Sequence, residues 1–177
     1  QKPKLTIICD ISGSMALNSL FGVTLLYGMV TKFASIRAYV FIDGITDISK
    51  NLRHIKKNEI ETIFSRWSEF VKSDGHSDYQ KSFEELIESD TSEKGTLIVI
   101  GDARNNYRNI SENLIVNLSN KYKKIFWINP EQKKYWNTGD SQMKKFQEIN
   151  FKTSEVRNYK QLKSFIKELD FKKVLTS

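Results

Sequence analysis

The sequence predicts a doubly wound α/β fold, with a mainly parallel sheet, one antiparallel edge strand and helices on both faces. Apolar runs of strand length alternate along the chain with longer segments whose apolar residues recur every three or four positions. Two of the runs, residues 5–9 and 96–100, are apolar almost throughout, which is typical of parallel strands buried on both faces. The 177 residues are enough for one domain with its own core. We therefore expect a single domain over residues 1–177, and its start almost directly in a strand predicts a fragment of a longer protein.

The first half of the chain begins with a strand that ends in Asp10. The apolar segment that follows has the length of a helix, and its apolar side chains lie nearly all round, as expected for a helix packed on a sheet. Asp43 and Gly44 supply turn residues, so we expect a hairpin at one edge of the sheet. The expected elements are a strand over 5–10, a helix over 15–34, strands over 36–42 and 46–49, and an amphipathic helix over 58–72.

The second half of the chain continues the alternation of helix and strand. Crossovers between parallel strands are right-handed in nearly all proteins, which distributes the helices over both faces of the sheet. Asp140 opens one of these helices, and because Asp is a preferred N-cap we expect it to cap that helix. The expected elements are helices over 79–89, 111–120, 140–148 and 158–171, and strands over 96–102, 124–129 and 151–156.

Charge and composition limit the classes of partner. The chain carries 28 Lys and Arg against 21 Asp and Glu, a net charge of +7. These cations are scattered over expected helix faces and loops, without the interleaved aromatic residues of a single-strand platform, so we do not expect a nucleic acid as the partner. Residues 16–30 are apolar but too short to span a bilayer, so we expect no membrane contact. Cys9 is the only cysteine, which excludes an intrachain disulfide and fits a reducing, cytoplasmic location.

Side chains that carry oxygen follow two of the expected buried strands. Asp10, Ser12 and Ser14 come after the first strand. Asp102 comes after the strand at 96–100, and the carboxyl ends of the strands are where ligands bind in an open α/β sheet. A carboxylate combined with hydroxyls is an oxygen-only donor set that suits Mg²⁺ or Mn²⁺. The alternative interpretation is that the serines only cap the next helix, since Ser is a preferred N-cap.

The pattern Asp-x-Ser-Gly-Ser over residues 10–14 resembles the metal-ion-dependent adhesion site (MIDAS) of von Willebrand factor A (VWA) domains. In that family two serines and a threonine from a second loop ligate the ion, and the outer carboxylates often act through water. The resemblance implies that Ser77 takes the place of the threonine and that Asp78 orients the loop or the ligand water. Asp102 matches the aspartate of the family's third loop. The implied metal ligands are Asp10, Ser12, Ser14, Ser77 and Asp102.

More of the chain, from about residue 5 to residue 169, resembles the CoxE-like branch of the VWA proteins. The segments that carry this resemblance are Gly75-His-Ser-Asp-Tyr79, Gly101-Asp-Ala-Arg-Asn-Asn-Tyr107, Trp127-Ile-Asn-Pro-Glu131 and Trp136-Asn-Thr-Gly-Asp-Ser141. Members of that branch are commonly encoded beside AAA+ ATPases of the MoxR type, and the pair is thought to remodel or mature target proteins, including metalloenzymes. The resemblance implies a non-catalytic module that uses Mg²⁺ or Mn²⁺ to recruit a Glu or Asp of a partner protein, together with a MoxR-type ATPase.

Two other functions remain open from the residues alone. A Mg²⁺-dependent hydrolase or phosphotransferase would use Asp10 and Asp102, but no Lys, His or Glu stands at a recognisable general-base position and no glycine-rich phosphate loop follows the first strand. A nucleic-acid-binding domain would depend on the net charge of +7. Beside the expected site, Arg104, Asn105 and Asn106 are candidates either to contact a partner's carboxylate or to cap the next helix.

Overall fold

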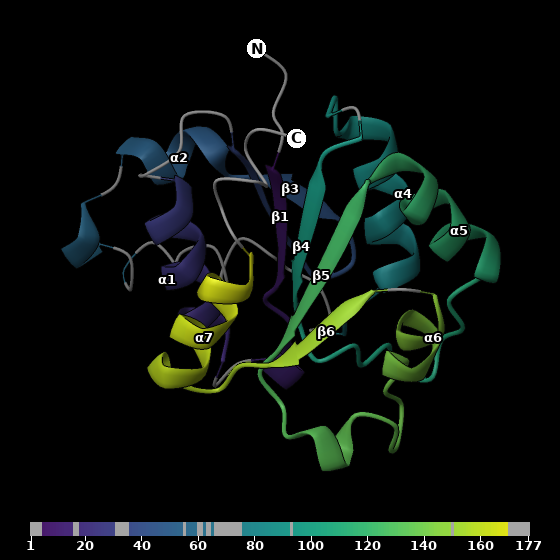
Figure 1. Ribbon diagram of the computed structural model, residues 1–177. Helices are drawn as coiled ribbons and strands as arrows, with labels where there is room; N and C mark the ends of the chain where they lie inside the picture. Colours follow the sequence, from purple (N-terminus) through teal and green to yellow (C-terminus); the bar gives the residue numbers. More distant parts are fainter. Residues whose placement is uncertain are drawn as a thin grey trace.

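The computed structural model describes residues 5–15, 18–30, 36–54, 56–59, 62, 65, 76–92, 94–149 and 151–169. Six strands lie in this part of the chain: β1 (Leu5–Asp10), β2 (Ile36–Phe41), β3 (Ile45–Asp47), β4 (Thr96–Ile100), β5 (Lys124–Asn129) and β6 (Lys152–Glu155). They form one sheet in the order β3-β2-β1-β4-β5-β6 (Figure 1). β3 is antiparallel to β2 at one edge, and the other neighbouring strands are parallel. The expected fold class is confirmed.

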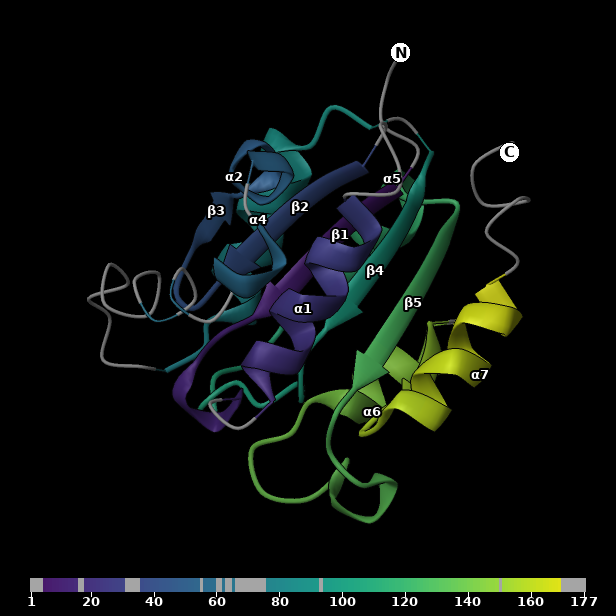
Figure 2. The same ribbon diagram turned by 90° about the vertical axis from the view of Figure 1, so that its left-hand side faces the viewer.

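Helices cover both faces of this sheet. The α-helices of the described residues are α1 (Ser19–Val30), α2 (Ser49–His54), α4 (Tyr79–Ser89), α5 (Glu112–Lys121), α6 (Met143–Glu148) and α7 (Tyr159–Leu169), and the short 3-10 segments are η1 (Gly13–Met15), η2 (Lys57–Glu59) and η3 (Lys133–Tyr135). Figures 1 and 2 show α1 and α7 on one face of the sheet and α4, α5 and α6 on the other. None of the described helices combines the length and the apolar character needed to cross a membrane.

Each face of the sheet buries its own apolar cluster. Successive side chains of a strand point to opposite faces, so β1 contributes Ile7 and Cys9 to one cluster and Ile8 to the other. The first cluster includes residues of α1, α2 and α7. The second includes Phe83 of α4 and Trp127 of β5, together with residues of α5 and α6. Burial on both faces explains why β1 and β4 are apolar almost throughout.

Most expected elements lie within a few residues of their observed positions. α4 and β5 have the expected bounds, α5 is shifted by one residue, and α1 begins only at Ser19. Most of the helix expected over 58–72 lies outside the described residues. The expectation that Asp140 caps the next helix was wrong, because α6 begins at Met143 with Gln142 at its N-cap. The Asp140 carboxylate instead binds groups of the loop that follows β4.

The two central strands define where the candidate site lies. Chain order runs from β1 to β2 on one side of the sheet, whereas β4 is added to β1 on the other side. Such a switch in direction leaves a crevice beyond the carboxyl ends of the two central strands. Asp10 is the last residue of β1, and Asp102 lies two residues beyond the end of β4. Both aspartates therefore flank this crevice.

Candidate metal centre

The first loop of the candidate site begins at Asp10, whose side chain is fully buried. Its Oδ1 accepts a hydrogen bond of 2.8 Å from the backbone N–H of Ser12, which turns the loop back onto the end of β1. The hydroxyl oxygens of Ser12 and Ser14 lie 3.2 Å apart, and Ser12 is buried whereas Ser14 is exposed. Neither serine caps α1, which begins at Ser19. The loop presents two neighbouring hydroxyls beside a buried carboxylate.

The second loop brings Ser77 to the same carboxylate. Ser77 is buried, and its hydroxyl donates a hydrogen bond of 3.1 Å to Oδ2 of Asp10. The next residue, Asp78, caps α4 by accepting a hydrogen bond from the N–H of Lys81, and its other carboxylate oxygen lies 3.0 Å from the guanidinium of Arg108. Asp78 therefore holds the second loop to the start of α4 while Ser77 contacts Asp10.

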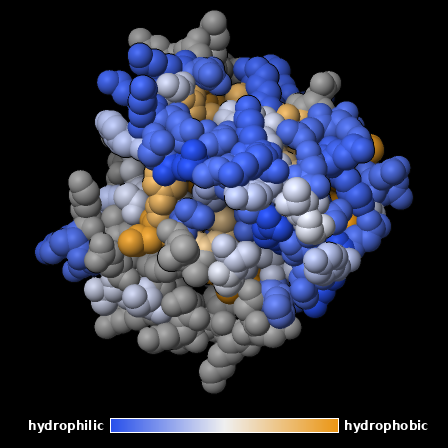
Figure 3. Space-filling view, turned by 90° about the horizontal axis from the view of Figure 1, so that it is seen from below, coloured by the Kyte–Doolittle hydropathy of each residue, from blue (hydrophilic) through white to orange (hydrophobic). Residues whose placement is uncertain are grey.

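The third loop contributes Asp102, which is buried beyond the end of β4. One carboxylate oxygen accepts a hydrogen bond of 2.9 Å from the N–H of Arg104, and the neighbouring Ser14 hydroxyl acts to lower the pKa of the Asp102 carboxyl. Between them, Ala103 has φ of 62°, a left-handed conformation that residues other than glycine rarely adopt. Ser14 of the first loop and Asp102 of the third loop are therefore neighbours. Figure 3 shows this end of the molecule from below, where the described residues are largely hydrophilic with a small hydrophobic area.

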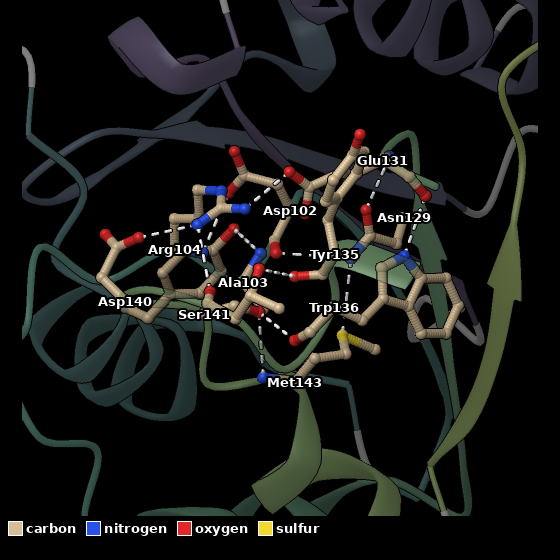
Figure 4. Close-up of polar contacts among 12 residues, drawn as sticks. Asp102, Ala103, Arg104, Asn129, Glu131, Tyr135, Trp136, Asp140, Ser141 and Met143 are labelled. Carbon is tan, nitrogen blue, oxygen red and sulfur yellow. Dashed lines mark hydrogen bonds and ion pairs between the residues drawn. The ribbon is translucent and has the colours of Figure 1, made fainter. Parts of the chain in front are cut away.

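Arg104 connects the third loop to the loop that follows β5. Its guanidinium lies between two carboxylates, 2.6 Å from Glu131 and 2.9 Å from Asp140 (Figure 4). Burial lowers the pKa of Arg104, but hydrogen bonds to the two carboxylates outweigh burial and raise it, so Arg104 stays protonated. The guanidinium thus pairs with carboxylates of this chain, and these ion pairs hold the loop that carries Asp102, an arrangement called here the Arg104 brace.

The asparagines that follow Arg104 also hold this loop. Asn105 is fully buried, and its Oδ1 accepts a hydrogen bond of 2.8 Å from the N–H of Tyr79. The backbone N–H of Asn106 donates to Asp140. Of the two alternatives left open for these residues, capping of the next helix is wrong, because Ser111 is the N-cap of α5. Two of the three candidate residues, Arg104 and Asn105, support the candidate site from within the chain.

The electrostatics of the site are dominated by two buried carboxylates. Burial raises the pKa of Asp10, although hydrogen bonds from neighbouring hydroxyls and from the Ser12 N–H offset part of the effect. Burial also raises the pKa of Asp102 to about 7, and the negative charge of Asp10 contributes to the same increase. The ionised forms are therefore disfavoured in the protein alone. A bound divalent cation would reverse this preference, because it stabilises the ionised carboxylates.

The donor set fits a hard divalent cation. The hydroxyl of Ser77 directs its proton at Asp10. A hydroxyl that donates its proton to a carboxylate keeps both oxygen lone pairs for another partner. The described residues contain no cluster of three or more His, Cys, Asp or Glu side chains suited to a metal. A cation at this site would therefore depend on the serine hydroxyls together with the two aspartates.

One residue of this site was not expected from the sequence. Tyr79, at the start of α4, is fully buried, and its hydroxyl donates a hydrogen bond of 2.7 Å to Oδ2 of Asp10. The same hydroxyl oxygen accepts a hydrogen bond of 3.2 Å from the N–H of Ala103. In the sequence Tyr79 is one member of an apolar helix face, and the signs of its proximity to the site are its place beside Asp78 and in the segment from Gly75 to Tyr79.

Fold and sequence together define the class of protein, a VWA domain. The model of the family described as "VWA domain containing CoxE-like protein" matches residues 1–165, and the chain belongs to this family. No curated protein is significantly similar to the chain in sequence.

Solved structures share the fold at low sequence identity. The conserved hypothetical protein BatB from Bacteroides thetaiotaomicron matches with a TM-score of 0.66 and 14% identity, covering 99% of this chain and 100% of that chain. An aerotolerance-related membrane protein from Bacteroides fragilis, with multiple mutations to serines, matches with a TM-score of 0.59 and 14% identity over 94% and 97% of the two chains. Proximal thread matrix protein 1 from the mussel byssus matches with a TM-score of 0.54 and 12% identity, covering 88% of this chain and 44% of that chain. These similarities concern the fold alone.

Proposed function

We propose that this VWA domain is a non-catalytic module that binds Mg²⁺ or Mn²⁺ and uses the cation to recruit an acidic side chain of a partner protein. The VWA family supports a protein-interaction module in general. One observation carries the finer proposal: hydrogen bonds of Ser77 and Tyr79 join three separate loops around two buried carboxylates at the switch point of the sheet. The proposed ligands are Asp10, Ser12, Ser14, Ser77 and Asp102.

The charge of the donor set suits recruitment of a carboxylate. Asp10 and Asp102 are the only charged members of the proposed ligand set, and the three serine hydroxyls are neutral donors, so the cation would keep strong Lewis acidity. When bound, the cation would supply a Lewis-acidic position for one oxygen of a Glu or Asp side chain of the partner. Asp78 is already occupied in capping α4 and in the ion pair with Arg108, so we assign it a supporting role.

A hydrolase or phosphotransferase is less consistent with these contacts. The groups that hydrogen-bond to Asp10 are a backbone amide, the hydroxyl of Ser77 and the hydroxyl of Tyr79. Burial raises the pKa of Tyr79 well above its usual value, so Tyr79 stays protonated and is not a general base at neutral pH. We therefore favour a binding role, and the family suggests a MoxR-type AAA+ ATPase as the associated protein, acting in protein remodelling or metalloenzyme maturation.

Calorimetric titration of the domain with Mg²⁺ and with Mn²⁺ tests the proposal. We expect the wild type to bind, and a Ser12→Ala, Ser14→Ala double variant to bind at least about tenfold more weakly, since it loses two proposed ligands. The matched control is a Ser119→Ala, Ser164→Ala double variant, because these exposed serines hydrogen-bond to helix carbonyls far along the chain from the site loops. The control should bind like the wild type.

Three outcomes would overturn the proposal. A wild type that binds neither cation, alone or with added glutamate and the candidate ATPase, has no metal site. Mg²⁺-dependent phosphatase or nuclease turnover that is lost in Asp10→Ala would identify an enzyme. Partner capture that is unchanged by EDTA but falls steeply with salt would indicate binding through the net positive charge.

A further inference from the structure

Tyr79 touches both of the loops that carry the proposed aspartate ligands. Its hydroxyl donates to Oδ2 of Asp10 at 2.7 Å in the first loop. The same oxygen accepts the N–H of Ala103 at 3.2 Å in the third loop, next to Asp102. One buried hydroxyl therefore uses its donor and an acceptor position at the same time, and each bond goes to a different loop.

The ring of Tyr79 is held in place independently of its hydroxyl. It lies edge-on to Phe41 with centroids 4.8 Å apart, edge-on to Phe83 at 5.6 Å, and stacked on Trp127 at 5.7 Å. The indole N–H of Trp127 donates to the backbone carbonyl of Gly101 at 2.8 Å, so the same aromatic cluster also fixes the end of β4. The position of the hydroxyl is thus set by the core and does not depend on any ligand.

Gly101 allows the hydroxyl to reach this position. A Cβ atom on residue 101 would lie 2.3 Å from the Tyr79 hydroxyl oxygen and 3.1 Å from Cβ of Asp10. The absence of a side chain at Gly101 lets the hydroxyl sit between the ends of β1 and β4. The hydroxyl also accepts the N–H of Ala103, whose left-handed conformation needs support from its surroundings.

We propose that Tyr79 is a positioning residue that locks the first and third loops together and so preassembles the cation site before any cation binds. The expected effect of Tyr79 on cation binding rests on the proposed function. The link between the two loops does not, because it is present in the cation-free protein. Tyr79 acts through Asp10 and Ala103, and it is not itself a proposed ligand. Removal of its hydroxyl should leave the ring packed in the core while releasing the two loops from each other.

The test compares Tyr79→Phe with Tyr122→Phe. Tyr122 is the matched control, because it is also buried and its hydroxyl also donates a hydrogen bond, of 2.6 Å, to a buried carboxylate, that of Asp90. That pair lies at the opposite end of the sheet, where Thr6 near the start of β1 binds the same carboxylate. Both variants lose one hydroxyl and one hydrogen bond to an aspartate, so a general loss of stability would affect them alike.

Two measurements separate a positioning role from a structural one. In the cation-free protein, amide hydrogen exchange at Ala103 should be about tenfold faster in Tyr79→Phe, because the amide loses its acceptor, and unchanged in Tyr122→Phe under conditions of local opening. In calorimetric titration, Tyr79→Phe should bind Mg²⁺ about tenfold more weakly than the wild type, and Tyr122→Phe should bind within about twofold of it.

The outcomes distinguish this inference from the proposed function. If the wild type does not bind Mg²⁺ but exchange at Ala103 is accelerated only in Tyr79→Phe, the lock stands and the metal proposal fails. If the wild type binds Mg²⁺ and Tyr79→Phe changes neither exchange nor affinity, the lock is refuted and the metal proposal stands. Tighter Mg²⁺ binding by Tyr79→Phe also refutes the lock, because it means that the hydroxyl competes with the cation for Asp10.

Discussion

Replacement of Gly101 by alanine tests the packing that supports the candidate site. The new methyl group would place a carbon 2.3 Å from the hydroxyl oxygen of Tyr79 and 3.1 Å from Cβ of Asp10. The tyrosine cannot move aside freely, because its ring is stacked on Trp127 and packs edge-on against Phe41. Either the hydroxyl or the end of β4 must shift, and each shift lengthens a hydrogen bond to Asp10 or to Ala103.

We expect Gly101→Ala to lower the free energy of unfolding by about 3 kcal/mol. Overpacking of a well-packed core costs about 1–3 kcal/mol. Weakening a hydrogen bond to a charged group such as Asp10 adds to this, since such a bond contributes about 1.5–3 kcal/mol when intact. Gly28→Ala is the matched control, because a Cβ atom there meets nothing within 4 Å in the interior of α1. We expect this control to gain about 0.5–1 kcal/mol from helix propensity.

Urea unfolding followed by tryptophan fluorescence measures both variants against the wild type. The same Gly101→Ala change is then made in a Tyr79→Phe background, where the phenyl ring leaves room for the methyl group. The cost of Gly101→Ala should be smaller in that background, and the difference between the two costs reports the contact. An equal cost in both backgrounds, or a loss below about 0.5 kcal/mol in the wild type, would refute the close packing of the hydroxyl on Gly101.

Two further predictions concern the charges around the site. Folding raises the pKa of Asp102 from 3.8 to about 7. The unfolding free energy of the cation-free domain should therefore fall as pH rises between these two values and level off above them. Urea midpoints measured between about pH 4 and about pH 8 test this. Mg²⁺ favours the ionised carboxylate, so the affinity of the domain for Mg²⁺, measured by calorimetry, should rise over the same pH range. In Asp102→Asn this affinity should depend less on pH, because the titrating carboxyl is gone. Arg104→Ala leaves Glu131 and Asp140 without their cation, and since both side chains are mostly buried it should cost about 2 kcal/mol in urea unfolding. Changing both acids to their amides in the Arg104→Ala variant should recover part of this loss, and no recovery would exclude unpaired charge as its cause.

The fold could be predicted because its elements are encoded by local patterns. β5 and α4 have their expected bounds, since one is a continuous apolar run and the other is a periodic helix with Asp78 as N-cap. The start of α6 was missed for a physical reason. Asp140 has the residue type of an N-cap, but its carboxylate is used by Arg104 and by the Asn106 N–H from another part of the chain. A preference of about 1 kcal/mol for a cap is easily outweighed by such contacts.

The sequence predicts those residues of the candidate site that directly follow a strand. Asp10 and Asp102 stand at the ends of apolar runs, so the topology of the fold brings them to one crevice. The role of Tyr79 depends instead on contacts between segments far apart in the sequence. Its hydroxyl, at the start of α4, reaches Asp10 at the end of β1 and lies against residue 101 just after β4, where there is no side chain. The brace formed by Arg104 with Glu131 and Asp140 likewise joins two loops that the sequence does not relate.

A second buried aspartate shows what a purely structural carboxylate looks like in this protein. Asp90 has about the same small exposed fraction as Asp102. It accepts hydrogen bonds of 2.6 Å each from the hydroxyls of Thr6, Ser92 and Tyr122. Burial alone would raise its pKa, but hydrogen bonds from these hydroxyls outweigh burial and lower it, so the charge is stabilised by the protein itself.

At the two aspartates of the candidate site, hydrogen bonds compensate for burial only in part. Asp10 also accepts a backbone N–H and hydroxyl hydrogen bonds, yet its pKa is raised, chiefly by burial. Asp102 lies close enough for the charge of Asp10 to raise its pKa as well. A fold that stabilises the Asp90 carboxylate at one end of β1, but leaves two disfavoured carboxylates at the other, retains an electrostatic cost that a bound cation would relieve. This contrast supports the proposed cation site at the carboxyl end of the sheet and a structural role for Asp90 at the opposite end.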